Sequence, residues 1–434
     1  MSGVQHRALA LVTALTVLFG AALTTGAGAA DVVPGPAGAR QAQASLPGTK
    51  FTSPNTDSCP YATTPPAPAD ASEVPVPGAT APAPLPRPTH PVGGGALGGC
   101  GVLQAPGTPT VPEGISAAAW VVADLDTGQV LAAKDPHGLH RPASTLKVLT
   151  SLLVLRTLRL DQVVTGTQAD ADVEGSGVGV GPGGQYTVRE LLTGLLLNSG
   201  NDAAHALAVA MGGVPETVVA MNSLAESIGA LDTRAATPSG LDGPGMSTSA
   251  YDLAVFFRLA MADPTFAELT ATRKAQFPGY ANKPAFEIDN DDKLLPNYPG
   301  ALGGKPGYTD DARQTFVGAA ERGGRRLVVS LVAAERTPLL PWQQAAALLD
   351  YSFALPPVTP GVGQLVDVAP TQARATTSSL AAAPAGAAPT TTAISARSAA
   401  GVLGFAVLAL LAALVAVFLL IVLDAVLRRR RRAG

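Results

Sequence analysis

The chain has 434 residues, of which 47% are hydrophobic and 14% charged, and its formal net charge is −3. This balance argues against nucleic acid as a partner, because domains that bind nucleic acid carry an excess of positive charge. Both ends differ in composition from the middle, so only residues 113–355 are expected to form a globular domain; about 240 residues suffice for one substantial core.

Residues 1–30 have the layout of a secretory signal peptide. Arg7 precedes the apolar run 8–23, and small residues follow at 27–30. A charge, an apolar segment and a small-residue cleavage site come in this order in signal peptides. We therefore expect the domain that follows to be exported.

Residues 31–112 are rich in Pro, Gly and Ala. They are expected to be mostly extended or disordered, because so little apolar surface does not offset the chain entropy lost on folding. The segment contains Cys59 and Cys100, the only two cysteines of the chain. An exported context favours a disulfide between them, and two free thiols are the alternative.

The middle segment begins and ends with strand patterns. Residues 120–133 alternate around an Asp-Thr-Gly turn and predict a β-hairpin. Helical patterns fill most of residues 144–262, strands follow between 303 and 333, and residues 341–351 predict a last helix. Strands on both sides of a helical middle indicate an α+β fold, with an antiparallel sheet packed against helices.

Ser144 and Lys147 open the first of these helical patterns. Positions three apart lie on one helix face, about 5–6 Å apart at Cβ, so the two side chains are able to touch. A serine hydroxyl needs a base to take its proton, and a lysine serves once burial or a second cation lowers its pKa. For an isolated S-x-x-K, however, a capping serine and a solvated lysine are the better interpretation.

Two further motifs follow in order along the chain. Ser199 and Asn201 form an S-x-N after a helical pattern that opens with Thr187 and Glu190, spaced as a capping box. A K-x-G begins at Lys305 and leads into the closing strands. The ordered set S-x-x-K, S-x-N and K-x-G is typical of penicillin-binding proteins and class A β-lactamases.

With these motifs, residues from about 118 to about 353 resemble the serine D-alanyl-D-alanine carboxypeptidases, the low-molecular-mass penicillin-binding proteins. The longer segments 195–204, 238–242 and 247–254 are similar to the family as well. The resemblance implies a penicillin-binding/β-lactamase-like transpeptidase fold.

The resemblance also implies a role for each catalytic residue. Ser144 is the nucleophile that forms the acyl-enzyme, and Lys147 is its general base. Ser199 relays a proton to the leaving D-alanine. Asn201 holds either Lys147 or the substrate amide through its bifunctional side chain.

The K-x-G strand is implied to bind the substrate. Lys305 supplies the second cation and attracts the substrate carboxylate, and Gly307 and Thr309 line the binding strand. The backbone N–H of Tyr308 forms the oxyanion hole with that of Ser144. Pro306 departs from the family, which usually has a threonine there; proline offers neither hydroxyl nor N–H, so altered β-lactam affinity with retained acylation is expected.

Other polar residues are given ordinary structural roles. His140 is interpreted as a surface-loop residue rather than the base of a Ser-His-Asp triad, because Ser144 lacks the G-x-S-x-G elbow. Asp202 is interpreted as a helix N-cap and His205 as a packing or surface histidine. Asp310 and Asp311 are expected to be solvated in a turn.

Residues 175–184 contain a formal G-x-G-x-x-G. No helix follows it directly, as a dinucleotide site would require, so a mobile loop near the cleft is expected instead. No cluster of His, Cys, Asp and Glu has metal-ligand spacing, and neither a metal nor a cofactor is expected.

The C-terminal part predicts an anchor. Residues 356–398 are rich in Pro, Ala and Thr and predict a flexible linker. Residues 399–423 are all apolar and long enough to span a bilayer, which predicts a transmembrane helix over 399–427. The arginines within 428–434 then form a cytoplasmic tail, and the positive-inside rule places the catalytic domain outside a single-pass cell membrane, facing the cell wall.

Three functions are weighed. The leading one is a D,D-carboxypeptidase that trims the terminal D-alanine from peptidoglycan stem peptides and binds β-lactams covalently. A β-lactamase of the same fold is the first alternative, although no E-x-x-L-N segment follows Ser199 to activate a deacylating water. A weakly active cell-wall-binding homologue is the second, and only Pro306 favours it.

Overall fold

The computed structural model describes residues 51–368. The predicted signal peptide (1–30), transmembrane helix (399–427) and basic tail (428–434) lie outside the described residues, as do 31–50 and most of the linker. These assignments stay predictions.

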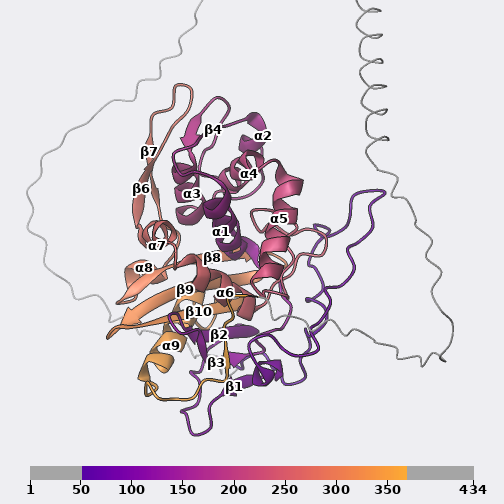
Figure 1. Ribbon diagram of the computed structural model, residues 1–434, viewed down its shortest axis with the longest axis vertical. Coiled ribbons are helices and arrows are strands. Elements are labelled where there is room, and N and C mark those ends of the chain that lie inside the picture. Colours follow the sequence, from indigo (N-terminus) through magenta and orange to yellow (C-terminus); the bar gives the residue numbers. More distant parts are fainter. Residues whose placement is uncertain (1–50, 369–434) are drawn as a thin grey trace, which may run out of the picture. The chain divides into compact units, whose positions relative to one another are not determined.

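One antiparallel sheet of seven strands organises the described part, in the order β1-β3-β2-β10-β9-β8, with β11 also paired to β3 (Figure 1). Its strands are β1 (Val102–Gln104), β2 (Ala119–Asp124), β3 (Gln129–Lys134), β8 (Ala301–Thr309), β9 (Arg313–Arg322), β10 (Arg325–Ala334) and β11 (Gly363–Gln364). The predicted hairpin over 120–133 is confirmed as β2 and β3, and the closing strands as β8, β9 and β10. Two short ribbons stand apart: β4 (Val163–Thr165) with β5 (Gln185–Thr187), and β6 (Lys274–Phe277) with β7 (Phe286–Asp289).

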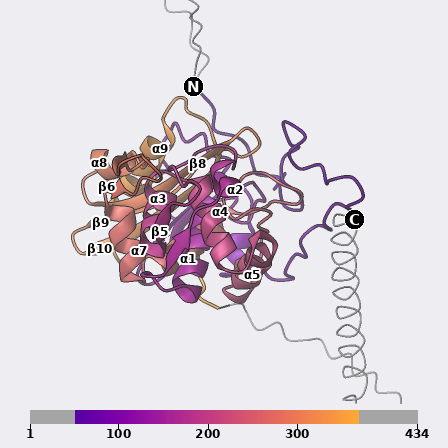
Figure 2. The same cartoon turned by 90° about the horizontal axis from the view of Figure 1, so that it is seen from above.

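Helices cover both faces of the sheet, and viewed from above α1, α3 and α4 lie in front of it (Figure 2). The helices are α1 (Lys147–Thr157), α2 (Gln168–Ala171), α3 (Val188–Leu197), α4 (Asn201–Ala210), α5 (Val214–Ser227), α6 (Ala250–Ala260), α7 (Pro264–Ala271), α8 (Leu294–Asn297) and α9 (Pro341–Ala354). The predicted capping box starts α3, where Thr187 and Glu190 each bond the other's backbone N–H. Taken singly, no helix within 51–368 has the length and apolar composition to cross a membrane; α4 and α5 meet that test only as a pair bent by 91°.

The sheet separates two hydrophobic cores because successive strand residues point to opposite faces. Val121 packs with α1, α3 and α6 in the larger core. Its neighbour Val122 packs with α9 in the smaller one. The α+β architecture predicted from the sequence is confirmed.

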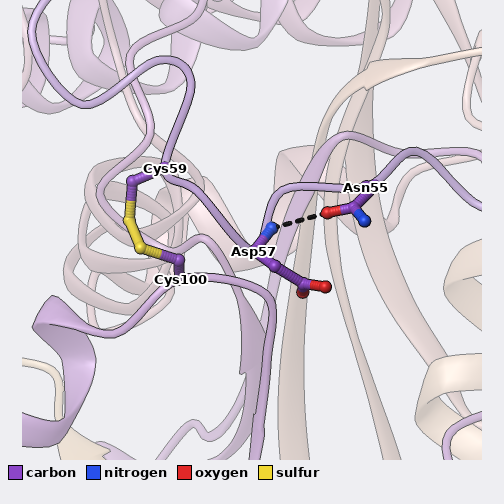
Figure 3. The surroundings of a disulfide bond; sticks show 4 residues. All are labelled: Asn55, Asp57, Cys59 and Cys100. Atoms are coloured by element: carbon purple, nitrogen blue, oxygen red, sulfur yellow. Dashed lines mark hydrogen bonds between the residues drawn. A yellow bond between two sulfur atoms is a disulfide. The ribbon is translucent and has the colours of Figure 1, made fainter.

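The expectation of a mostly extended or disordered segment is wrong over residues 51–112 only as to disorder, since these residues are ordered. They have little regular structure, but specific bonds hold them to the domain, which their low apolar content did not indicate. β1 pairs with β3, and Lys134 Nζ donates to the Pro54 carbonyl at 2.6 Å. Within the segment, Cys59 and Cys100 form the predicted disulfide (Figure 3). Since β11 also joins the sheet, the folded unit extends beyond both predicted boundaries, 113 and 355.

Candidate active site

Ser144 lies in a tight turn that precedes α1. Residues Ala143–Leu146 form a 3-10 helix, and the α-helix begins at Lys147. This places the hydroxyl at the N-terminal end of a long apolar helix, as the sequence predicted. Lys147 Nζ lies 2.8 Å from Ser144 Oγ.

Two more oxygens contact the Lys147 amine. Asn201 Oδ1 lies 2.7 Å from Nζ and the Ser239 carbonyl 2.8 Å from it. Both oxygens only accept hydrogen bonds. A neutral amine has two N–H groups and one lone pair, so when both N–H groups serve these oxygens the lone pair faces the Ser144 hydroxyl.

The electrostatic surroundings favour that neutral form. Burial, and secondly the charge of Lys305, lower the pKa of Lys147 well below its ordinary value. Burial also lowers the pKa of Lys305, to about 8, while Asp291 and Asp292 oppose the shift. Both effects on Lys147 favour its uncharged form beside a charged Lys305.

The turn that carries the Ser239 carbonyl fits tightly under the nucleophile. Gly240 has φ +84°, and a Cβ built there would lie 1.9 Å from the Ala143 carbonyl oxygen. Only glycine accepts both the left-handed conformation and this approach. The similarity of residues 238–242 to the family is the only sequence signal for this turn, and it indicates no role for the Ser239 carbonyl.

The open edge of β8 borders Ser144. A Cβ on Gly307 would lie 2.8 Å from the Ser144 nitrogen, so this glycine permits the close approach of strand and nucleophile. The Pro306 carbonyl accepts from Lys305 Nζ at 3.1 Å. Proline also has no N–H that could bond β9. Both observations indicate that the backbone N and C=O of residue 306 face away from β9. Alternate residues of a strand share this orientation, so the Tyr308 N–H points to the open edge beside Ser144.

Pro306 itself lies opposite Phe316 of β9, in the strand at the edge of the described sheet, where proline is tolerated. Its ring lines a cavity of about 680 Å³ together with Tyr308 and Trp342. Three cations also border this cavity: Lys293, Arg313 and Arg336.

The other predicted residues have the following places. Ser199 has φ +58° in the turn between α3 and α4, and its side chain is buried. The Thr309 hydroxyl accepts from the Ala312 N–H at 2.9 Å and so holds the β8–β9 turn. His205 Nδ1 pairs with Asp170 at 2.6 Å and is a partly exposed packing histidine, as expected.

The glycine-rich loop is bonded to Asp202 at residues 178–180, while its mobility stays a prediction. Asp202 lies in the first turn of α4, whose N-cap is Gly200, so the N-cap assignment of Asp202 is wrong. Its carboxylate instead accepts from the N–H groups of Val178, Gly179 and Val180 at 2.7 to 3.0 Å. Those amides are thus not available to a phosphate.

His140 and Asp311 are buried rather than solvated, so both surface assignments are wrong. His140 packs against Tyr61, and burial lowers its pKa to about 3, which keeps the ring neutral. Asp311 accepts from the Ala69 N–H and the Ser72 hydroxyl. Both are covered by the N-terminal segment, for which disorder was one expectation.

Within residues 51–368, no group of three or more His, Cys, Asp or Glu converges as a metal site.

Comparison with known proteins agrees with this geometry. A family described as D-alanyl-D-alanine carboxypeptidase matches residues 105–336. The chain is 50% identical over 260 residues to D-alanyl-D-alanine carboxypeptidase DacB2 of Mycobacterium tuberculosis, covering 59% of this chain and 88% of that relative. It is 31% identical over 240 residues to DacF of Bacillus subtilis, covering 54% of this chain and 61% of that relative.

Solved structures show the same fold. A crystal structure of D-alanyl-D-alanine carboxypeptidase from Mycobacterium tuberculosis matches with a TM-score of 0.58 and 51% identity, covering 61% of this chain and all (100%) of that one. The Streptomyces K15 DD-transpeptidase matches with a TM-score of 0.54 and 29% identity, covering 57% of this chain and 100% of that one. The chain belongs to the D-alanyl-D-alanine carboxypeptidase family of serine peptidases.

Proposed function

We propose that this protein is an exported, membrane-anchored D,D-carboxypeptidase that removes the terminal D-alanine from peptidoglycan stem peptides. The family match supports the enzyme class. The sequence patterns at residues 1–30 and 399–434 support export and a single-pass anchor. Deleting residues 399–434 should release the enzyme from the membrane fraction; retention there would contradict the anchor.

One observation carries the proposed chemistry: Lys147 is buried and holds its amine 2.8 Å from the Ser144 hydroxyl while two oxygens occupy its other hydrogen-bonding positions. A solvated lysine beside a capping serine would show none of this. The arrangement suits a lysine that receives a proton.

The reaction follows from these positions. Ser144 Oγ attacks the D-Ala-D-Ala carbonyl and gives its proton to Lys147 Nζ, while the N–H groups of Ser144 and Tyr308 hold the oxyanion. The C–N bond then breaks as Lys147 gives up this proton, which Ser199 relays to the nitrogen of the leaving D-alanine. Water hydrolyses the resulting ester, which restores Ser144.

Release of D-alanine from diacetyl-Lys-D-Ala-D-Ala tests this function directly. The wild-type protein should release D-alanine, and Ser144→Ala should not. Fast nitrocefin turnover without peptide cleavage would favour the β-lactamase alternative. Binding of cell wall without either activity would favour the weakly active homologue.

The pH dependence should reflect the two lysines. Lys147 acts as a base only when deprotonated, so kcat/KM should rise as pH increases through its lowered pKa. Lys305 attracts the carboxylate only when protonated, so kcat/KM should fall above about pH 8. If Lys305→Arg remains active, it should lose this alkaline decline, because a guanidinium does not titrate there. An unchanged decline would show that another group causes it.

Pro306 should weaken but not prevent acylation. Pro306→Thr adds a hydroxyl at the cleft, and one hydrogen bond to a carboxylate is worth about 1.5 kcal/mol, or roughly tenfold in β-lactam acylation efficiency. Pro306→Ala is the control, since it restores the N–H without the hydroxyl. Equal acylation rates for the two variants would show that the hydroxyl contributes nothing.

A further inference from the structure

Residues 59–100, closed by the Cys59–Cys100 disulfide and here called the disulfide loop (Figure 3), lie outside the family match, which begins at 105. The loop contacts the segment just before the nucleophile. The Leu139 N–H donates to the Tyr61 carbonyl at 2.9 Å. An ordered segment outside the family match therefore packs against the residues that precede Ser144.

The disulfide loop also contacts Arg141, three residues before Ser144. The Arg141 guanidinium pairs with both carboxylate oxygens of Glu73, one of them at 2.9 Å, and donates to the Pro66 carbonyl at 2.8 Å. Its side chain is only 2% exposed. A buried guanidinium needs such partners, and a bidentate carboxylate also fixes its orientation.

A second contact lies on the other side of the oxyanion hole. Asp311 follows Tyr308 by three residues, and its carboxylate accepts from the Ala69 N–H and, at 3.2 Å, from the Ser72 hydroxyl. Asp311 Oδ2 is also 3.9 Å from Arg141 Nε. The disulfide loop therefore makes hydrogen bonds on both sides of the oxyanion hole. It bonds Arg141, which precedes the Ser144 N–H, and Asp311, which follows the Tyr308 N–H.

We infer that the disulfide loop is a positioning element of the active site, in which Glu73 on Arg141 and residues 69–72 on Asp311 together fix the separation of the two oxyanion N–H groups. Glu73 is a positioning residue, because it contacts Arg141 and not the reacting atoms. This inference rests on the acyl transfer proposed at Ser144. A shift of about 1 Å in such a site costs on the order of 100-fold in rate, so loosening the contacts should act on the chemical step.

The test compares Glu73→Gln with wild-type enzyme by benzylpenicillin acylation and peptide turnover, each normalised to the number of sites that finally acylate. We expect the acylation rate constant and kcat to fall roughly 10- to 100-fold, with KM and the pH profile little changed because both lysines remain. Glu113→Gln is the matched control: it makes the same change at an exposed position before the catalytic core and should leave the rates unaltered.

Ser72→Ala is a milder second variant that loosens the Asp311 side alone, and it should slow acylation in the same direction but less. If Glu73→Gln and Ser72→Ala lower the melting temperature yet acylate at the wild-type rate per site, the disulfide loop only stabilises the fold and the inference is overturned. Failure of the wild-type enzyme to acylate at all would instead contradict the proposed function.

Discussion

Replacing Lys147 with methionine is expected to slow acylation of Ser144 by about 1,000-fold or more, because a positioned general base contributes 100- to 10,000-fold. Methionine keeps an unbranched chain of similar length in the fully buried position but has no nitrogen to receive the serine proton. The rate constant for benzylpenicillin acylation, followed by mass spectrometry, measures the loss.

Lys134→Met is the matched control for this change. Lys134 is also buried, and burial also lowers its pKa, in this case to about 8. Its amine donates to two oxygens, the backbone carbonyls of Pro54 and Ala117. The two variants should therefore lose comparable stability, since each leaves buried acceptors without a donor. Only Lys147→Met should slow the acylation of Ser144. Equal acylation rates per folded molecule in the two variants would contradict the role of Lys147 as the base.

Gly240→Ala is expected to have the second large effect, although residue 240 supplies no reacting group. The added Cβ would meet the Ala143 carbonyl at 1.9 Å, next to the nucleophile and to the Ser239 carbonyl that holds Lys147. Either the turn or the 3-10 helix must move, so we expect at least a 100-fold slower acylation and a loss of about 3 kcal/mol in stability.

Gly107→Ala separates backbone strain from the clash. Gly107 has φ +81°, close to the +84° of Gly240, but a Cβ there meets nothing within 4 Å. It should cost only the strain of a left-handed alanine, about 1–2 kcal/mol, and leave acylation unchanged. If Gly240→Ala behaved like Gly107→Ala, the tight packing under Ser144 would have no catalytic consequence.

The sequence predicted those parts of the site that depend on short motifs. The i to i+3 spacing of Ser144 and Lys147 brings them together as soon as a helix begins there. Asn201 and Lys305 were found through the order of three motifs, which needs no knowledge of how the intervening segments pack.

Contacts that depend on long-range geometry were not predictable in this way. The Ser239 carbonyl acts through its backbone, so residue type gives no sign of its contact with Lys147. Low apolar content indicates disorder in the N-terminal segment, whereas the β1–β3 pairing and the Glu73–Arg141 pair hold it to the domain, and the disulfide closes a loop within it. The burial of His140 depends on its contact with Tyr61 of this segment, which no local sequence pattern indicates.

The most direct test of the account is the mass of the intact protein after incubation with benzylpenicillin, followed by mapping of the modified peptide. If Ser144 is the nucleophile, the wild-type protein gains one penicilloyl group per molecule, located on Ser144 and absent from Ser144→Ala. An adduct that persists in Ser144→Ala, or no adduct on a correctly folded wild-type protein, would contradict it.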